Sequence, residues 1–218
     1  MLRFLKKKQK ERAVFKIFTF YNSQINPEIP KYQKLVFDKF GISINQIKDD
    51  GTNHAGFLNK ICKNTLDTDY LIFFDIDCVP TKKEWIVHLL NELLESKETI
   101  VGAAQTANHI GDAKNLYISP FFVGISTDFL KKLNYPDATA NSKMDVWQNI
   151  TEQAKLHNGN LNYWWPTHIE EEKWYLNHPV HNKFGIGTTY NDLIYHAFFS
   201  RENNSDGFIN KCKLILAQ

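Results

Sequence analysis

Short hydrophobic runs alternate along this chain with segments in which hydrophobic residues recur at helical spacing. The runs at 15–20, 70–74 and 99–103 have the length of strands, and the run at 70–74 is hydrophobic throughout, as expected of a central strand covered on both faces. The segments at 30–41 and 81–94 instead place hydrophobic residues three or four positions apart, which is typical of amphipathic helices. This alternation predicts an α/β fold with a mostly parallel central sheet flanked by helices.

Turn and capping signals mark the ends of several expected elements. Pro30 is a suitable first residue for the first long helix, and Ser126 is a suitable N-cap for a helix that follows a strand or strand pair at 116–125. Thr81 and Ser142 each stand three positions before an acidic residue, which is the capping-box pattern. We therefore expect two further helices to begin at these residues.

Composition narrows the class of protein. A chain of 218 residues with 43% hydrophobic content can bury the core of one domain, which we place at 15–218 after a basic arm at 1–14. The net charge of +2 does not favour nucleic acid as a partner, and the three cysteines lack the spacing of a zinc site or disulfide framework. Hydrophobic runs are too short to span a bilayer, so we expect a soluble, cytoplasmic protein. The arm is either a solvated terminus or a weak, peripheral membrane contact.

The most informative motif follows the hydrophobic run at 70–74. Asp75 and Asp77 are two positions apart, so on an extended segment their carboxylates project to one side, at the strand end where α/β folds bind ligands. Carboxylate oxygens are the ligands that Mg²⁺ and Mn²⁺ prefer. The motif predicts a divalent metal site, although both residues would also suit a simple turn before Pro80.

The chain from 15 to 201 resembles the GT-A glycosyltransferases, whose metal motif is an Asp-x-Asp at the end of a hydrophobic strand. The likeness is carried by an early strand, by the helix that begins His54-Ala55-Gly56 and by Asp75-Ile76-Asp77-Cys78-Val79-Pro80. It implies transfer of a sugar from a UDP- or GDP-sugar donor to a carbohydrate-type acceptor, with Mn²⁺ or Mg²⁺. It also implies contacts to the donor from a set of polar side chains: Thr19, Tyr21, Asn22, Asp50, His54, Asn59, Asp75 and Arg201.

The same resemblance suggests the remaining catalytic groups. Asp145 stands where inverting members of the family carry their catalytic base, although it would also serve as the capping-box carboxylate of a helix begun at Ser142. The segment from Tyr195 to Arg201 is similar to the family's C-terminal histidine segment, which makes His196 a third metal ligand. Without the resemblance, His196 would be a buried core histidine.

Two other functions use part of this pattern. Haloacid-dehalogenase-type phosphatases also place an Asp-x-Asp after a hydrophobic strand, and Asp75 would then be the nucleophile. Their layout needs a later acidic pair, whereas the adjacent aspartates here, at 49 and 50, lie upstream. A binding domain for nucleotide-sugars or glycans without catalysis is the second alternative.

The segment from 164 to 189 is harder to interpret. Its tryptophans and tyrosine at 164, 165, 174 and 175 either stack on sugar rings or belong to the core. We expect the histidines and glutamates of 168–181 to lie in a solvated polar loop, and the glycines of 184–189 suggest a mobile lid.

Overall fold

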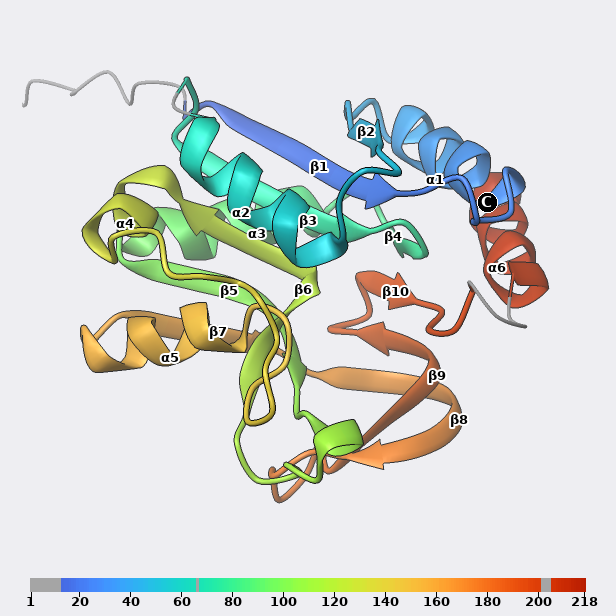
Figure 1. Cartoon of the computed structure of the whole chain (residues 1–218). Helices are drawn as coiled ribbons and strands as arrows, with labels where there is room; N and C mark the ends of the chain where they lie inside the picture. The colour runs from blue at the N-terminus through green and yellow to red at the C-terminus, as the bar shows by residue number, and fades with distance from the viewer. Residues whose placement is uncertain (1–12, 66, 201–204) are drawn as a thin grey trace, which may run out of the picture.

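Figure 1 shows the computed structural model of the chain, which describes residues 13–65, 67–200 and 205–218. The described residues form a six-stranded and a four-stranded sheet. The larger sheet has the order β2-β1-β3-β6-β5-β7, with strands β1 Phe15–Tyr21, β2 Asn45–Lys48, β3 Tyr70–Asp75, β5 Thr99–Gln105, β6 Tyr117–Ser126 and β7 Asn160–Trp164. The smaller sheet has the order β4-β10-β9-β8, with strands β4 Cys78–Pro80, β8 Pro166–Tyr175, β9 Lys183–Tyr190 and β10 Ile194–His196.

The central sheet is parallel except for one strand. β1 pairs in parallel with β2 and β3, and β5 with β7, whereas β6 runs antiparallel between β3 and β5. The prediction of an α/β fold with a mostly parallel sheet flanked by helices is therefore confirmed. The region at 116–125 forms one continuous strand instead of two short ones.

Helices cover both faces of this sheet. They are α1 Glu28–Lys39, α2 His54–Asn64, α3 Trp85–Glu95, α4 Thr127–Lys132, α5 Gln148–Leu156 and α6 Ser205–Ala217, with a short 3₁₀ turn, η1, at Asn108–Ile110. Along β3, Leu71 and Phe73 pack into the cluster that includes α2, α4 and α5, while Ile72 and Phe74 pack into the cluster that includes α1 and α3. The alternation explains why β3 is hydrophobic at every position, since both of its faces are buried.

The second sheet lies beside the carboxyl end of β3, next to the helix pair α1 and α6 (Figure 1). Its strand β4 continues directly from the Asp75-Ile76-Asp77 segment and pairs antiparallel with β10. Ile76 and Val79 pack with α1 and α6 in a separate hydrophobic cluster. The acidic segment is thus the point at which the chain leaves one sheet and enters the other.

Three local predictions were wrong. Thr81 caps no helix, because its hydroxyl donates to the carbonyl of Asp192 and α3 begins only at Trp85. The polar segment at 166–175 is β8 and not a loop. The segment at 184–189 is not a free lid, because it belongs to β9, which pairs with β8 on one side and β10 on the other. The loop prediction failed because β8 is polar and exposed and so lacks the hydrophobic run by which β3 could be recognised in the sequence.

Gly185 offers a test of this assignment of β9. A Cβ at this position would lie 1.9 Å from the carbonyl oxygen of Glu171 and 2.8 Å from the amide nitrogen of Lys173, both backbone atoms of β8. Gly185→Ala should therefore destabilise the fold by about 2 kcal/mol or more, which lowers the melting temperature by roughly 4–8 °C. In Gly51→Ala, the matched control, the added Cβ meets only a side-chain oxygen at 3.3 Å. Equal melting temperatures for the two variants would contradict the pairing of β8 with β9.

The beginning of the chain is described from Ala13 onward, so most of the expected basic arm lies outside the described residues. Val14 is joined to the fold, since its amide donates to the carboxylate of Asp69 and its carbonyl accepts from the amide of Tyr70. None of the helices in the described ranges has the length and hydrophobicity needed to cross a membrane.

Candidate metal-binding site

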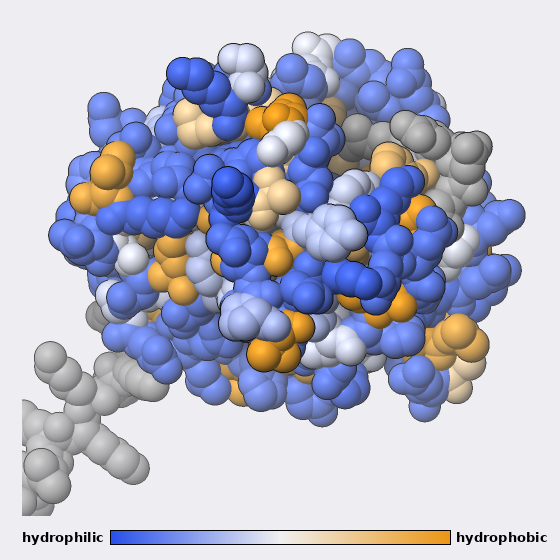
Figure 2. All heavy atoms as spheres, turned by 90° about the horizontal axis from the view of Figure 1, so that it is seen from below, coloured by the Kyte–Doolittle hydropathy of each residue, from blue (hydrophilic) through white to orange (hydrophobic). Residues whose placement is uncertain are grey.

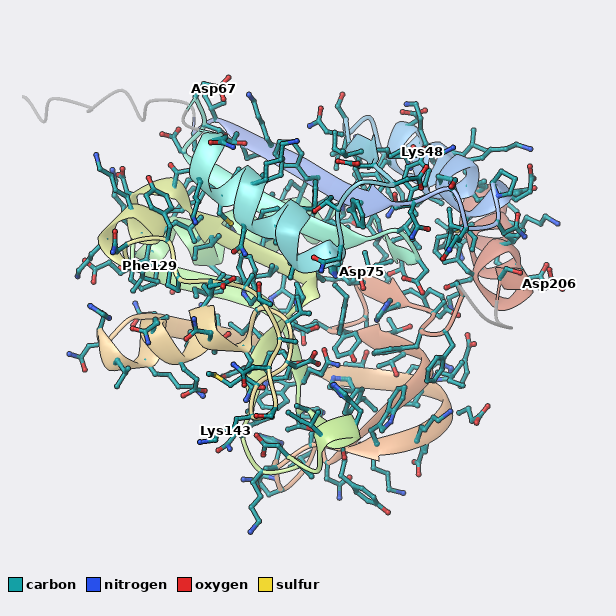
Figure 3. All side chains as sticks on the ribbon, in the orientation of Figure 1. Lys48, Asp67, Asp75, Phe129, Lys143 and Asp206 are labelled. Carbon is teal, nitrogen blue, oxygen red and sulfur yellow. The ribbon has the colours of Figure 1, made fainter. Side chains whose placement is uncertain are left out.

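The two aspartates lie at the turn that joins β3 to β4. Asp75 is the last residue of β3, and Asp77 directly precedes β4. Ile76, between them, is 1% exposed and points to the opposite side, into the cluster with α1 and α6. Both carboxylates line one cavity, but Ile76 and Asp77 form a turn and not the extended segment that the sequence analysis assumed. Figure 3 shows Asp75 near the middle of the molecule, where the two sheets meet.

A buried glutamine on α1 fixes this turn. The Gln33 side-chain amide donates to the carbonyl oxygens of Asp75 (2.8 Å) and Cys78 (3.0 Å), and its own oxygen accepts from Gln46. Sequence analysis missed Gln33. Its signal was a polar residue on a helix face that is otherwise hydrophobic, with Ile29, Val36 and Phe37 buried on the same helix.

Strand pairing brings His196 to the aspartates from 119 positions away. In the register of β10 with β4, His196 lies opposite Cys78, the residue after Asp77. One more hydrogen bond extends the contact, from the amide of Ala197 to the carbonyl of Asp77 at 3.1 Å. The position of His196 is therefore set by backbone pairing.

The three side chains form a cluster with metal-ligand geometry. His196 Nε2 lies 3.2 Å from Asp77 Oδ1 and 3.9 Å from Asp75 Oδ2. One potential ligand atom from each residue falls within 4.8 Å of the other two, a spacing that one ion can bridge. Two carboxylates and one imidazole combine the hard oxygens that suit Mg²⁺ and Mn²⁺ with a nitrogen donor. Among the described residues, this is the one such group of three or more histidine, cysteine or acidic side chains.

Asp77 is the most buried member of the cluster, at 8% exposure. Burial by itself would raise the pKa of Asp77, but the charge and hydrogen bond of His196 and the Ser200 hydroxyl outweigh it and lower this pKa below its usual value. The Ser200 hydroxyl donates to Asp77 Oδ2 in a short hydrogen bond. Asp77 is thus ionised at neutral pH and can bind a cation without first losing a proton. Ser200 was not predicted as a partner.

Aromatic rings hold the imidazole in place. The His196 ring stacks on Phe121 with centroids 4.1 Å apart, and Phe198 lies against it at 3.9 Å. His196 Nδ1 is buried and accepts or donates no hydrogen bond within the described part of the chain. Its orientation therefore depends on this packing and on the carboxylates at Nε2.

Two adjoining cavities open at the cluster. One, of about 240 Å³, is lined by His54, Asp75, Asp77, His196 and Ser200 among others. The other, of about 230 Å³, shares His54, Asp75 and His196 and adds Asp145. His54 Nε2 lies 3.3 Å from Asp75 Oδ1. The structure therefore brings together five of the residues singled out in the sequence around one cleft.

Asp145 is held in this cleft by neutral donors. Its Oδ2 accepts from the Tyr117 hydroxyl at 2.7 Å, and its Oδ1 accepts from the amide of Val146 at 2.7 Å. His109 Nε2 lies 3.7 Å from Oδ1. Burial, reinforced by the charge of Asp145, raises the pKa of Tyr117 well above its usual value, so the phenol stays protonated as a donor. Sequence analysis gave no indication of Tyr117 or His109.

The predicted capping box at Ser142 was wrong. Asn141 closes this turn instead, since its side-chain oxygen accepts from the backbone amides two and three positions later. Helix α5 starts at Gln148, after Trp147, whose backbone is in the left-handed region at φ 72°. The Trp147 side chain is fully buried against Phe73, with centroids 5.4 Å apart. Core packing of this ring decides where α5 begins and leaves Asp145 in the preceding loop.

The other expected donor-binding residues are placed differently. Thr19 is fully buried, and its hydroxyl has no partner among the described residues. Asn22 Oδ1 accepts from the amide of Gln24, and Tyr21 packs on the edge of the cluster with α1 and α6. None of these three lines either cavity at Asp75.

Asp50 and Asn59 are engaged in loop contacts. Asp50 accepts from the amide and hydroxyl of Ser23, and these hydrogen bonds lower its pKa. Asn59 donates to Asp137 and accepts from the amide of Ala138. Neither of the two lines the cavities at Asp75. Arg201 lies outside the described residues.

The phosphatase layout requires a second acidic pair at the nucleophile. Here the groups nearest the Asp75 carboxylate are the imidazoles of His54 and His196. The upstream pair is used in turns, because Asp49 Oδ1 accepts from the amide of Gly51 and Asp50 binds Ser23. The upstream aspartates therefore do not supply the second acidic pair that the phosphatase layout requires.

Comparison with known proteins gives partial similarities to solved structures. No family model and no curated protein sequence matches the chain. Solved structures with a similar fold include A197 from STIV, with TM-score 0.46 and 16% identity over 67% of this chain and 80% of that one. Another is a mutant Drosophila beta-1,4-galactosyltransferase 7 in complex with manganese, UDP-Gal and xylobiose, with TM-score 0.47 and 11% identity over 87% and 75%.

A third is a protein named as a glucose-1-phosphate thymidylyltransferase from Bacillus anthracis, with TM-score 0.39 and 12% identity over 68% of this chain and 85% of that one. Similar structures thus include glycosyl- and nucleotidyltransferases. Each of these TM-scores is below 0.5, so the function proposed below rests on the chain's own side chains.

Proposed function

We propose that this protein is a metal-dependent glycosyltransferase that transfers a sugar from a nucleoside-diphosphate-sugar to an acceptor hydroxyl. The observation that carries the proposal is the meeting of Asp75, Asp77 and His196 at a cleft that Asp145 also lines. A site with three metal ligands and a separate carboxylate can serve both halves of such a reaction. The metal ligands would serve the leaving group, and the carboxylate would serve the nucleophile.

The ligand set fits a divalent ion with mixed preferences. Asp75 and Asp77 would supply oxygens, and His196 would supply a nitrogen, which favours Mn²⁺ over the strictly oxygen-seeking Mg²⁺. When bound, the ion supplies positive charge that offsets the diphosphate of the donor and stabilises it as a leaving group. Gln33 and Ser200 support these ligands by fixing the turn and the orientation of Asp77.

Asp145 is the proposed general base. The acceptor hydroxyl loses its proton to Asp145 while its oxygen bonds to the anomeric carbon of the donor. The bond from that carbon to the diphosphate oxygen breaks, and its electron pair leaves with the nucleoside diphosphate. Asp145 and Asp75 line the same cavity, so the base and the leaving group can act on one sugar, and we propose that they act on its opposite sides, with inversion. Tyr117 orients the carboxylate.

A thermal-shift screen tests the proposal on the full chain. UDP, GDP and their sugar conjugates are each added with and without Mn²⁺. At about 100 times the dissociation constant, a nucleotide that binds the folded state should raise the melting temperature by roughly 5–10 °C, and only when Mn²⁺ is present.

Release of the nucleoside diphosphate in the presence of an acceptor then separates catalysis from mere binding. Hydrolysis of p-nitrophenyl phosphate with a phosphorylated Asp75 would instead favour the phosphatase. A screen in which no nucleotide gives a Mn²⁺-dependent shift would contradict the proposed function.

A further inference from the structure

An aromatic recess of about 200 Å³ adjoins the cleft that contains Asp145. The rings of Trp174, Phe184, Phe198 and Phe199 line it, with polar groups that include Gln105 and His109. Trp174 comes from β8 and His109 from η1, so the recess lies between the smaller sheet and the connection that follows β5. No residue of the metal cluster lines it.

The recess adjoins the candidate active site, and some residues line both. Phe198 lines the recess and both cavities at Asp75, and Gln105 lines the recess and the Asp145 cavity. His109 reaches both regions, since it lines the recess and its Nε2 lies 3.7 Å from Asp145 Oδ1. The recess is therefore on the side of the cleft where the proposed base lies.

The aromatic walls are already assembled. The Trp174 ring lies 5.2 Å from Phe184, 5.1 Å from Phe198 and 5.6 Å from Phe199, measured between centroids. These distances are in the range of favourable ring contacts. Lys173 Nζ lies 4.4 Å from the centroid of Phe199 and fixes that ring further.

Two backbone irregularities present these rings to the recess. Phe198 and Phe199 have φ values of 56° and 54°, in the left-handed region that bulky residues rarely adopt. The register of β8 against β9 shifts between Glu172 and Trp174. Strained backbone and interrupted pairing both concentrate at binding sites, where they aim side chains.

The other two tryptophans of this segment are engaged in contacts elsewhere. Trp164 is 1% exposed, and its indole donates to Glu92. Trp165 packs against His178 and His181, at 4.1 and 5.6 Å between centroids. Of the tryptophans in this segment, Trp174 is thus the one whose ring faces a cavity next to the cleft.

We infer that the recess binds one pyranose ring of the acceptor, stacked on Trp174 with a hydroxyl directed toward Asp145. The inference rests on the proposed function. An aromatic wall with a polar edge suits the apolar face and peripheral hydroxyls of a sugar. About 200 Å³ is below the range of about 300–1,000 Å³ for drug-sized ligands, so one ring fits better than an extended ligand.

Location distinguishes the acceptor from the nucleobase of the donor. A general base must reach the hydroxyl from which it takes the proton, so the acceptor ring belongs on the side of Asp145. On one face, the described residues also offer little contiguous hydrophobic surface to a protein partner. On the face seen from below, hydrophobic residues form small separate patches among hydrophilic ones (Figure 2), whereas protein interfaces use larger contiguous patches.

Direct binding of simple glycosides to the full chain tests the recess. The probes are the methyl pyranosides of glucose, galactose, mannose, xylose and N-acetylglucosamine, followed by saturation-transfer NMR with and without Mn²⁺ and UDP. At least one should bind, and Trp174→Ala should weaken it about tenfold or more, while Trp174→Phe should retain part of the affinity. Tyr175→Ala is the matched control, since Tyr175 is the next residue of β8, is 63% exposed and does not line the recess.

The Mn²⁺-dependent melting shift with UDP reports separately on the donor side. It should be unchanged in Trp174→Ala, which also shows that this variant folds. Loss of that shift in Trp174→Ala would instead make the recess part of the nucleotide site and overturn the inference. Absence of binding by every glycoside, or equal binding by wild type and Trp174→Ala, would also overturn it. Failure of the proposed function would appear differently, as a wild-type protein with no Mn²⁺-dependent nucleotide shift.

Discussion

Asp77→Asn is expected to remove the Mn²⁺-dependent binding of nucleotide and to lower transfer by about 1,000-fold. Asp77 is 8% exposed and ionised, and His196 and Ser200 hold its two oxygens in place. Asparagine keeps the shape but loses the charge and one of the two oxygens. Loss of a charged ligand removes several kcal/mol of stabilisation from the ion and the diphosphate, and every 1.36 kcal/mol corresponds to tenfold in rate.

The measurement is the melting temperature with UDP, with and without Mn²⁺, together with the rate of nucleotide release. The wild-type shift of roughly 5–10 °C should fall close to zero. Asp206→Asn is the matched control, because Asp206 is exposed on α6, away from Asp75 (Figure 3). If the Asp77 variant kept a full Mn²⁺-dependent shift, the assignment of the metal site would be wrong.

Asp145→Asn is expected to lower the transfer rate by about 100- to 10,000-fold while nucleotide binding stays intact. The hydrogen bond from the Val146 amide is lost, but the asparagine oxygen can still accept from the Tyr117 hydroxyl and help to hold the loop. It cannot take a proton from the acceptor at neutral pH. The effect should therefore appear in kcat, whereas the Mn²⁺- and UDP-dependent melting shift should match that of the wild type.

The melting temperature and the activity of Asp145→Asn together distinguish a chemical role of Asp145 from a structural one. A variant with lower melting temperature and weaker nucleotide binding would show that Asp145 supports the fold through Tyr117 and Val146. Full activity in Asp145→Asn would exclude it as the base. Asp112→Asn is a useful control, because Asp112 likewise orders a loop by accepting from the amides of Lys114 and Asn115 and is not part of the cleft.

The central part of the fold could be predicted because its signals are local. The hydrophobic run of β3 reflects burial on both faces, and its abrupt end at Asp75 marks the edge of the sheet. Ser126 caps α4 as expected, accepting from the amide of Phe129. Each of these features leaves a pattern in neighbouring residues, so it can be recognised in the sequence.

The signals that failed were local patterns overruled by tertiary contacts. The capping-box patterns at Thr81 and Ser142 did not form caps. The Thr81 hydroxyl donates to the carbonyl of Asp192 instead. Near Ser142, burial of Trp147 in the core sets the start of the helix. The glycines of 184–189 suggested flexibility, yet the backbone of Gly185 lies too close to Glu171 for any side chain. Glycine here permits close strand packing, which a sequence pattern cannot distinguish from a hinge.

By itself, the sequence determined that two carboxylates stand two positions apart where a hydrophobic strand ends, because this feature is written in neighbouring residues. Only the tertiary structure decided which groups join them. The pairing of β10 with β4 brings His196 to Asp77, and burial of Trp147 leaves Asp145 facing the same cleft. The physical reason is that the end of a hydrophobic run can be recognised from neighbouring residues, whereas strand pairing and core packing depend on residues far apart in the chain.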